Sequence, residues 1–283
     1  MTTPPRIERQ LVHRHNENER FLREPEFDDG VPAFGIAVEE DHHILSSPDD
    51  PPPLIVMLEI ARQLSIAMCH VVHGLPAGWH AIANHMRVEW HVEPLTVREL
   101  NSHRTRAVVA SAAISQNTIA ANAISFDIEL YHRRRLIATA AVTASWATIR
   151  EYRILRGPNF FKSTLETKQI SPFLPGVRPR GRTLRAELAW DWRNTFYFDH
   201  EADHIPGMVL AGAAIEAAHL LQPSSTARFI DIQFNRYAEL DVPVIEAAET
   251  SPQDPAADDS SRSTAVAFTQ ATHEVCHATI GVF

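Results

Sequence analysis

Cysteine is scarce in this sequence, and the scarcity excludes one class of protein. Cys69 and Cys276 are the two cysteines among 283 residues, too few for the disulfide framework of a small secreted domain. Residues 1–8 contain no apolar core of a signal peptide, and no apolar run approaches the ~20 residues that a membrane-spanning helix requires. We therefore expect a soluble, cytoplasmic protein that does not bind a membrane.

An excess of positive charge is absent as well. The 35 acidic residues outnumber the 26 lysines and arginines, which gives a formal net charge of −9. Such a chain is not expected to bind nucleic acid over a broad surface, although the arginine-rich stretch 176–185 leaves a local basic pocket open. The hydrophobic fraction of 45% and the charged fraction of 22% are typical of a globular chain, with room for one large domain or two ordinary ones.

Metal-binding motifs are also missing, although the sequence has sixteen histidines. Two groups of close neighbours stand out, at 199–204 and at His42–His43. Neither group contains His-Glu-x-x-His, and the chain has no Cys-x-x-Cys pair. We therefore expect no metal site, with histidines at the surface or at helix ends as the simplest interpretation.

The most informative stretch that is present is the apolar segment 53–68. Its continuity predicts a helix buried on most of its circumference, starting after a proline-rich turn and ending near Gly74. Glu59 and Arg62 lie three residues apart and therefore share one face of this helix. Charged side chains are rarely buried unless they are paired or used. Two interpretations stay open here, a structural ion pair and a functional site.

Period-two alternation surrounds this helix and predicts antiparallel strands, so the fold class is α+β. The cleanest example is 124–132, where apolar and polar residues alternate. The predicted strands of this half are 10–13, 34–38, 80–90, 105–111, 124–132 and 136–149.

The same order then recurs, which indicates an internal duplication. Residues 156–184 are rich in proline, glycine and arginine and are interpreted as a linker between an N-terminal unit, 1–155, and a C-terminal unit, 185–283. The second unit is predicted to contain a strand at 188–198, a turn with Pro206-Gly207, an apolar helix at 208–221, strands at 227–234 and within 263–283, and an acidic loop at 249–262.

These motifs resemble one family. Asp199-His200 followed by Pro206-Gly207 and an apolar helix is similar to the pattern of hotdog dehydratases, in which a sheet wraps a long helix. The whole set resembles the AfsA-type γ-butyrolactone autoregulator biosynthesis proteins, which are tandem hotdogs. The matching motifs are Leu11–Arg14, Glu19–Leu22, Leu58–Gln63, Asp199–Leu210 and Phe234–Leu240.

One departure from the family pattern concerns the second helix. The family usually repeats Glu-x-x-Arg-Gln there. Glu59 lies six residues after Pro53, and the residue six after Pro206 is Gly212; Ile215 stands where arginine is expected. Glu216 could substitute only after a shift of one helical turn. The resemblance thus predicts one working site and one degenerate site.

The resemblance implies an acyltransferase that moves a β-ketoacyl group from an acyl carrier protein thioester to the hydroxyl of dihydroxyacetone phosphate, toward a γ-butyrolactone, furan or butenolide signal. Glu59, with a raised pKa, would be the base, and His200 from the other repeat would orient substrate or share proton transfer. Arg62 would bind phosphate, and the backbone at Gly207 would stabilise the thioester oxygen.

The other residues that the resemblance assigns to substrate binding are Gln63, His43 and His204. Two alternatives stay open: a hotdog dehydratase or thioesterase acting on acyl carrier protein thioesters, and a non-catalytic ligand-binding homologue. A monomeric pseudo-dimer and a homodimer are both compatible with the duplication.

Overall fold

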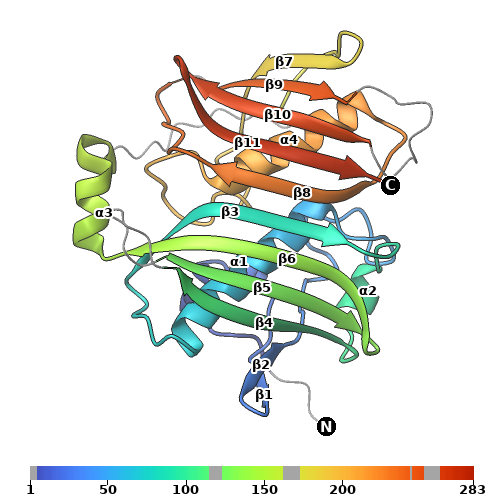
Figure 1. Ribbon diagram of the computed structural model, residues 1–283, viewed down its shortest axis with the longest axis vertical. Coiled ribbons are helices and arrows are strands. Elements are labelled where there is room, and N and C mark those ends of the chain that lie inside the picture. Colours follow the sequence, from blue (N-terminus) through green and yellow to red (C-terminus); the bar gives the residue numbers. More distant parts are fainter. Residues whose placement is uncertain (1–4, 115–122, 162–172, 243, 252–261) are drawn as a thin grey trace. The chain divides into compact units, whose positions relative to one another are not determined.

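The computed structural model describes the chain except for residues 1–4, 115–122, 162–172, 243 and 252–261 (Figure 1). The chain divides into two compact units, Met1–Leu155 and Arg156–Phe283. Each unit consists of an antiparallel sheet and one long buried helix. The α+β class predicted from the sequence is confirmed in both units.

In unit 1 the described strands follow the order β1-β2-β4-β5-β6-β3, and all neighbours are antiparallel. Four of the predicted strands are confirmed, with ends shifted by a few residues. The bounds are β1 Glu26–Asp28, β2 Val31–Phe34, β3 His80–Trp90, β4 Thr105–Ile114, β5 Ala123–His132 and β6 Arg135–Ala147, with the short helices η1 Arg9–Val12, η2 Glu17–Glu19, α2 Val97–Leu100 and α3 Ile149–Arg156.

The central helix of unit 1, α1 (Leu54–Val71), starts directly after Pro53, whose fixed φ suits a helix start. It packs against β3, β4 and β6 (Figure 1). Its length and composition would allow it to cross a membrane, but 83% of it is buried inside the unit, as expected for the core helix of a globular domain. Each buried Leu or Ile contributes roughly 1.5–3 kcal/mol, which explains why this helix holds the sheet around it.

Unit 2 repeats this architecture with α4 (Gly207–Leu221) on a sheet of order β8-β11-β10-β9-β7. The helix packs on the strands β7 to β11, as Figure 1 shows. Alanines and Gly212 form much of its buried face, so the sheet can approach closely. The strands are β7 Thr183–Glu187, β8 Ala227–Phe234, β9 Val244–Thr250, β10 Ser263–Gln270 and β11 His273–Val282, and η3 spans Gly157–Phe161.

Two predicted strands are wrong. Residues 9–12 form the helix η1, which ends because His13 takes the left-handed conformation with φ +50°. Residues 188–198 form turns, because the side chains of Asp191 and Asn194 accept hydrogen bonds from the backbone two residues on and so compete with strand pairing.

The remaining differences concern where strands begin. Strand β2 lies slightly before the predicted 34–38, which retains one isolated bridge, Leu22 to Ile36. The first strand of unit 2, β7, falls at the end of the predicted linker, and β9 was not predicted. Most of the predicted acidic loop at 249–262 lies outside the described residues.

Candidate active site

Glu59 is fully buried in unit 1 and binds two guanidinium groups. Arg62, one turn further along α1, reaches both carboxylate oxygens, with Nε 2.7 Å from Oε2 and Nη2 2.8 Å from Oε1. Arg14, from the segment after η1, places Nε 3.0 Å and Nη2 2.8 Å from Oε1. The spacing of Glu59 and Arg62 was visible in the sequence, whereas the ion pair with Arg14 joins residues 45 positions apart.

The pKa of Glu59 is lowered to about 2. Burial raises it, but the positive charges of Arg14 and Arg62, with hydrogen bonds from Arg62 and Gln63, outweigh the burial. The raised pKa expected from the sequence is therefore wrong. Glu59 is ionised at neutral pH, and a carboxylate stabilised this strongly is a weak base.

Gln63 lies one turn after Glu59 and is also fully buried. Its Nε2 donates to Glu59 Oε1 and to the Glu19 carbonyl, both at 2.7 Å, and its Oε1 accepts from the Phe21 N–H at 2.9 Å. The amide thus fixes the N-terminal segment onto α1. The substrate contact predicted for Gln63 stays a prediction.

Exposure distinguishes the two arginines. The side chain of Arg62 is 22% exposed, whereas that of Arg14 is 5% exposed. Arg62 Nη2 also lies 3.4 Å from the Val12 carbonyl. Arg62 is therefore the member of this cluster that reaches solvent.

A histidine pair lies at the C-terminal end of the same helix. His13 Nε2 is 3.0 Å from His70 Nε2, and His70 Nδ1 is 2.7 Å from the Leu75 carbonyl. The indole of Trp146 lies 5.8 Å from each imidazole, measured between ring centroids. Sequence reasoning missed this group, although His70 is eleven residues after Glu59 and so lies on the same helix face three turns away.

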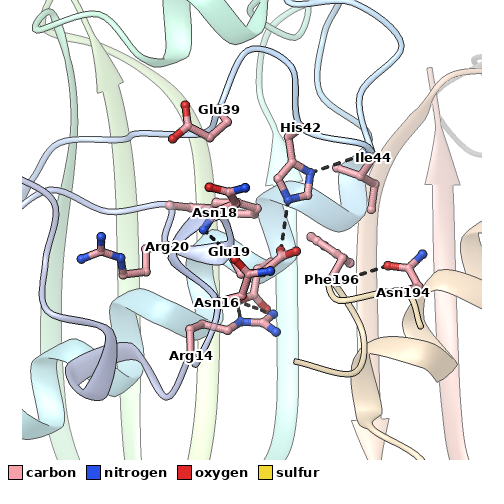
Figure 2. A network of polar contacts seen from close by, with 12 residues as sticks. Arg14, Asn16, Asn18, Glu19, Arg20, Glu39, His42, Ile44, Asn194 and Phe196 are labelled. Atoms are coloured by element: carbon pink, nitrogen blue, oxygen red, sulfur yellow. Dashed lines mark hydrogen bonds and ion pairs between the residues drawn. The ribbon is translucent and has the colours of Figure 1, made fainter. Parts of the chain in front are cut away.

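His43, predicted to bind substrate, lies beside a different pair. Figure 2 shows the ring of His42 between Glu19 and the Ile44 backbone. The Ile44 N–H donates to His42 Nδ1 at 3.3 Å, so Nε2 carries the proton and donates to Glu19 at 3.1 Å. His43 is exposed and stacks on His42 at 4.5 Å.

Glu19, His42 and His43 place one ligand atom each within 4.8 Å of one another, a spacing that a metal ion could use. A metal needs the unprotonated Nε2 of His42, however, and that nitrogen already binds Glu19 as a donor. The hydrogen bonds therefore fit a protein-internal contact better than a metal centre.

In unit 2, His204 belongs to a network around Arg156. The His204 Nδ1 is 2.6 Å from Asp203, which also accepts from Arg156 Nε at 2.9 Å. Arg156 further binds Glu239 at 2.9 Å and lies over the ring of Tyr237. Burial raises the pKa of Asp203, but hydrogen bonds and the charges of His204 and Arg156 outweigh it and lower the pKa to about 2.

The sequence did not point to Arg156, because this residue belongs to none of the motifs described above. The network nevertheless joins two of the motifs singled out in the sequence, the turn containing Asp203 and the segment containing Glu239. A substrate contact of His204 stays a prediction. His200 is exposed in unit 2, and its predicted approach to Glu59 in unit 1 also stays a prediction.

Gly207 is the first residue of α4, and a Cβ there would lie 2.8 Å from the Phe234 ring. Close packing therefore already requires glycine at this position. The predicted role of its backbone N–H toward a thioester oxygen stays a prediction.

Aromatic side chains fill the position in α4 that corresponds to Glu59. A Cβ on Gly212 would lie 2.8 Å from both the Phe173 ring and the Tyr197 hydroxyl. Burial, with Glu216 nearby, raises the pKa of Tyr197, so its hydroxyl stays protonated. No side chain larger than glycine fits at 212 without movement of these rings.

Glu216 has a different role from the one considered in the sequence. It accepts hydrogen bonds from the backbone N–H groups of Phe173 at 3.0 Å and Leu174 at 3.1 Å. Glu216 is ten residues after Pro206, as Gln63 is ten after Pro53, and each residue holds a Phe-Leu segment against its helix. Glu216 is thus the counterpart of Gln63 and does not replace Glu59.

Comparison with known proteins places these features in a family context. A family model described as "A-factor biosynthesis hotdog domain" matches residues 1–148 and 171–283. The chain is 31% identical to the 2-oxo-3-(phosphooxy)propyl 3-oxoalkanoate synthase of Streptomyces virginiae over 171 residues, which are 55% of this chain and 56% of that protein. It is 30% identical to the synthase of the same name from Streptomyces coelicolor over 209 residues, 67% of this chain and 64% of the relative. The matched regions thus span less than two thirds of these relatives.

Solved structures with similar folds include the 12:0-ACP thioesterase from Umbellularia californica, with a TM-score of 0.53, 12% identity and coverage of 89% of this chain and 92% of that one. A putative oleoyl thioesterase from Lactobacillus plantarum gives a TM-score of 0.51 at 10% identity, over 82% of this chain and 89% of that one. At these identities the similarity concerns the fold alone, and it agrees with two hotdog units.

Proposed function

Because this chain belongs to the AfsA family of A-factor biosynthesis hotdog proteins, we propose that it is an acyltransferase. It condenses a β-ketoacyl-acyl carrier protein thioester with the hydroxyl of dihydroxyacetone phosphate, in the biosynthesis of a γ-butyrolactone-type signal. The name of the relatives, 2-oxo-3-(phosphooxy)propyl 3-oxoalkanoate synthase, denotes a product of this class. The reaction forms the C–O bond of an ester, breaks the C–S bond of the thioester and releases the carrier thiol.

The observation that carries this proposal is the pair of guanidinium groups on Glu59. Arg14 and Arg62 bring two guanidinium groups to one carboxylate, and guanidinium groups are the side chains best suited to bind phosphate. Arg62 reaches solvent and offers donors in the fork geometry that suits phosphate. In this proposal Glu59 acts by holding both arginines in place, which agrees with its lowered pKa.

The low pKa of Glu59 argues against a dehydratase in which this carboxylate is the acid–base group. Such a group exchanges protons near neutral pH, whereas Glu59 stays ionised. A phosphate site requires a permanent positive charge, which the arginines provide. The cluster therefore favours a phosphorylated acceptor.

One such cluster per chain is proposed, because Gly212 and Ile215 in α4 carry no charge. The other residue roles, the donor and the location that the family implies are likewise proposals. His200, Gly207, His43 and His204 contribute to the acyl or triose part of the substrate, acyl carrier protein is the donor, and the cytoplasm, where such donors occur, is the location. No metal or organic cofactor takes part in the proposed reaction.

The test is mass analysis of the products formed from a β-ketoacyl-acyl carrier protein and dihydroxyacetone phosphate. A phosphorylated keto ester is the expected product. An enoyl thioester would support a dehydratase instead, and a free β-keto acid would support a thioesterase. Unchanged substrates would support a non-catalytic ligand-binding protein.

A further inference from the structure

The histidine pair at the end of α1 has a defined direction of hydrogen bonding. A carbonyl oxygen only accepts, so the 2.7 Å contact with Leu75 places a proton on His70 Nδ1. The Nε2 of neutral His70 is then an acceptor, and the 3.0 Å contact requires His13 Nε2 to donate. Neutral His13 therefore carries its lone pair on Nδ1. This order, from carbonyl to His70 to His13, fixes which nitrogen of His13 is basic.

The position of His13 relative to the arginine cluster is set by the backbone. The Val12 carbonyl before it lies 3.4 Å from Arg62 Nη2, and Arg14 after it binds Glu59. His13 thus lies between the two points at which the N-terminal segment contacts the proposed phosphate site. Both imidazoles are partly exposed, so a substrate can reach them.

The backbone of His13 is strained. Its φ of +50° is in the left-handed region, which costs a residue other than glycine roughly 1 kcal/mol or more. Strained backbone of this kind persists where the surroundings hold a side chain in a required place. Here the contacts of Val12, His13 and Arg14 with α1 provide that constraint.

Trp146 adds an independent observation. Its indole packs against both imidazoles and is 2% exposed, and its Nε1–H has no hydrogen-bond partner among the described residues. An unsatisfied buried donor costs about 1–3 kcal/mol. A carbonyl oxygen of a bound acyl group is the kind of acceptor that would remove this cost.

We propose that His13, positioned by His70, is the general base of acyl transfer in unit 1. This inference rests on the proposed function. His13 Nδ1 takes the proton from the hydroxyl of the triose phosphate held by Arg62 as its oxygen attacks the thioester carbonyl. The new C–O bond forms, the C–S bond breaks, and the imidazolium returns the proton to the leaving thiolate. Glu59 then orients the acceptor through the arginines, while the histidine moves the proton.

His13→Gln is the sharpest variant, because the glutamine amide can still donate to His70 but cannot act as a base. With β-ketoacyl-acyl carrier protein and dihydroxyacetone phosphate, we expect kcat to fall about 10²- to 10⁴-fold with little change in KM. The matched control is His103→Gln, an exposed histidine before β4, which should retain wild-type kcat. The thermal unfolding midpoint of each variant establishes that it is folded.

Two further variants distinguish a catalytic role of His13 from a purely structural one. His13→Ala should regain activity when free imidazole is added, which a purely structural histidine would not permit. His70→Gln, which can still accept from His13, should retain a higher kcat than His70→Ala. Wild-type kcat in folded His13→Gln, or no rescue by imidazole, would overturn the inference while the proposed function stands. No ester product from the unaltered chain would overturn both.

Discussion

At the scale of single residues, the charge of Glu59 is balanced by more than one partner. Arg14 and Arg62 both bind it, so two guanidinium groups meet at one carboxylate. A helix pair of Glu59 and Arg62 alone, one of the two interpretations of the sequence, would bring only one guanidinium group to this place. The ion pair between Arg14 and Glu59 changes the interpretation. It could not be predicted from residue spacing within the helix, because Arg14 lies 45 positions before Glu59.

Arg62→Lys tests the proposed phosphate contact. A lysine keeps the charge but loses the two-pronged geometry, so we expect KM for dihydroxyacetone phosphate to rise about 10- to 100-fold, which corresponds to roughly 1.4–2.8 kcal/mol. Steady-state kinetics with varied triose phosphate measures this change. Arg98→Lys is the control, because Arg98 forms exposed ion pairs with Glu40 and Asp49. An unchanged KM in Arg62→Lys would exclude a bidentate phosphate contact.

Glu246 shows the opposite electrostatic situation. It lies fully buried on β9, and neither carboxylate oxygen has a hydrogen-bond partner among the residues described. Burial, with the negative charge of Glu216, raises its pKa to about 9. The folded chain therefore keeps this proton at neutral pH, whereas the unfolded chain releases it above its usual pKa near 4.5.

It follows that the free energy of unfolding decreases as pH rises from about 4.5 toward 9, by at most ~1.4 kcal/mol per pH unit from this group. Glu246→Gln removes the titration and should make the protein more stable at pH 8 by about 1–3 kcal/mol. Urea unfolding at pH 6 and pH 8 measures both effects. Glu249→Gln, exposed on the same strand, should leave the pH dependence unchanged. An equal slope in wild type and Glu246→Gln would contradict the assignment.

At the scale of elements, the alternation of apolar and polar residues predicted the strands well where one face of the sheet is exposed to solvent. Strands β3 to β6 lie close to their predicted ranges. The failures have local causes, since the side chains of Asp191 and Asn194 accept hydrogen bonds from the backbone two residues on and form turns where a strand was predicted. The contacts of the candidate site were predicted in part: the spacing in the sequence puts Glu59 and Arg62 on one helix face, but Arg14 and His13 reach α1 only through tertiary packing.

The two long helices differ at the position of Glu59, where α4 has Gly212, and Gly212→Ala tests the packing there. A methyl group there would lie 2.8 Å from Phe173 and Tyr197, so we expect a loss of stability of about 1–3 kcal/mol from overpacking. The midpoint of urea unfolding measures it. Gly78→Ala serves as the control, because a Cβ at Gly78 meets nothing within 4 Å. If both variants unfolded alike, the aromatic side chains would not be fixed against α4.

At the scale of the whole molecule, two units of one architecture carry different polar clusters. Unit 1 has the arginine cluster on Glu59, and unit 2 has the network of Arg156 with Asp203 and Glu239. In the second network one arginine meets two carboxylates, so no positive charge remains for an anion. Duplication of the fold therefore does not imply duplication of the site.

The expected stoichiometry follows from this difference. Calorimetric titration with dihydroxyacetone phosphate should give one binding site per chain, with a heat that disappears in Arg62→Ala. Two equivalent sites per chain, or unchanged binding by Arg62→Ala, would show that the anion is bound elsewhere.

The filled position at Gly212 sets a limit on how the second unit can be redesigned. A glutamate placed at 212 would collide with Phe173 and Tyr197 before it could meet an arginine at 215. An engineer who wishes to restore a second reactive centre must therefore first shorten both aromatic side chains, while Glu216 keeps residues 173 and 174 attached to α4. Packing thus sets the order of the substitutions. Phe173 and Tyr197 must be replaced by smaller residues first, and glutamate at 212 and arginine at 215 can be introduced only afterwards.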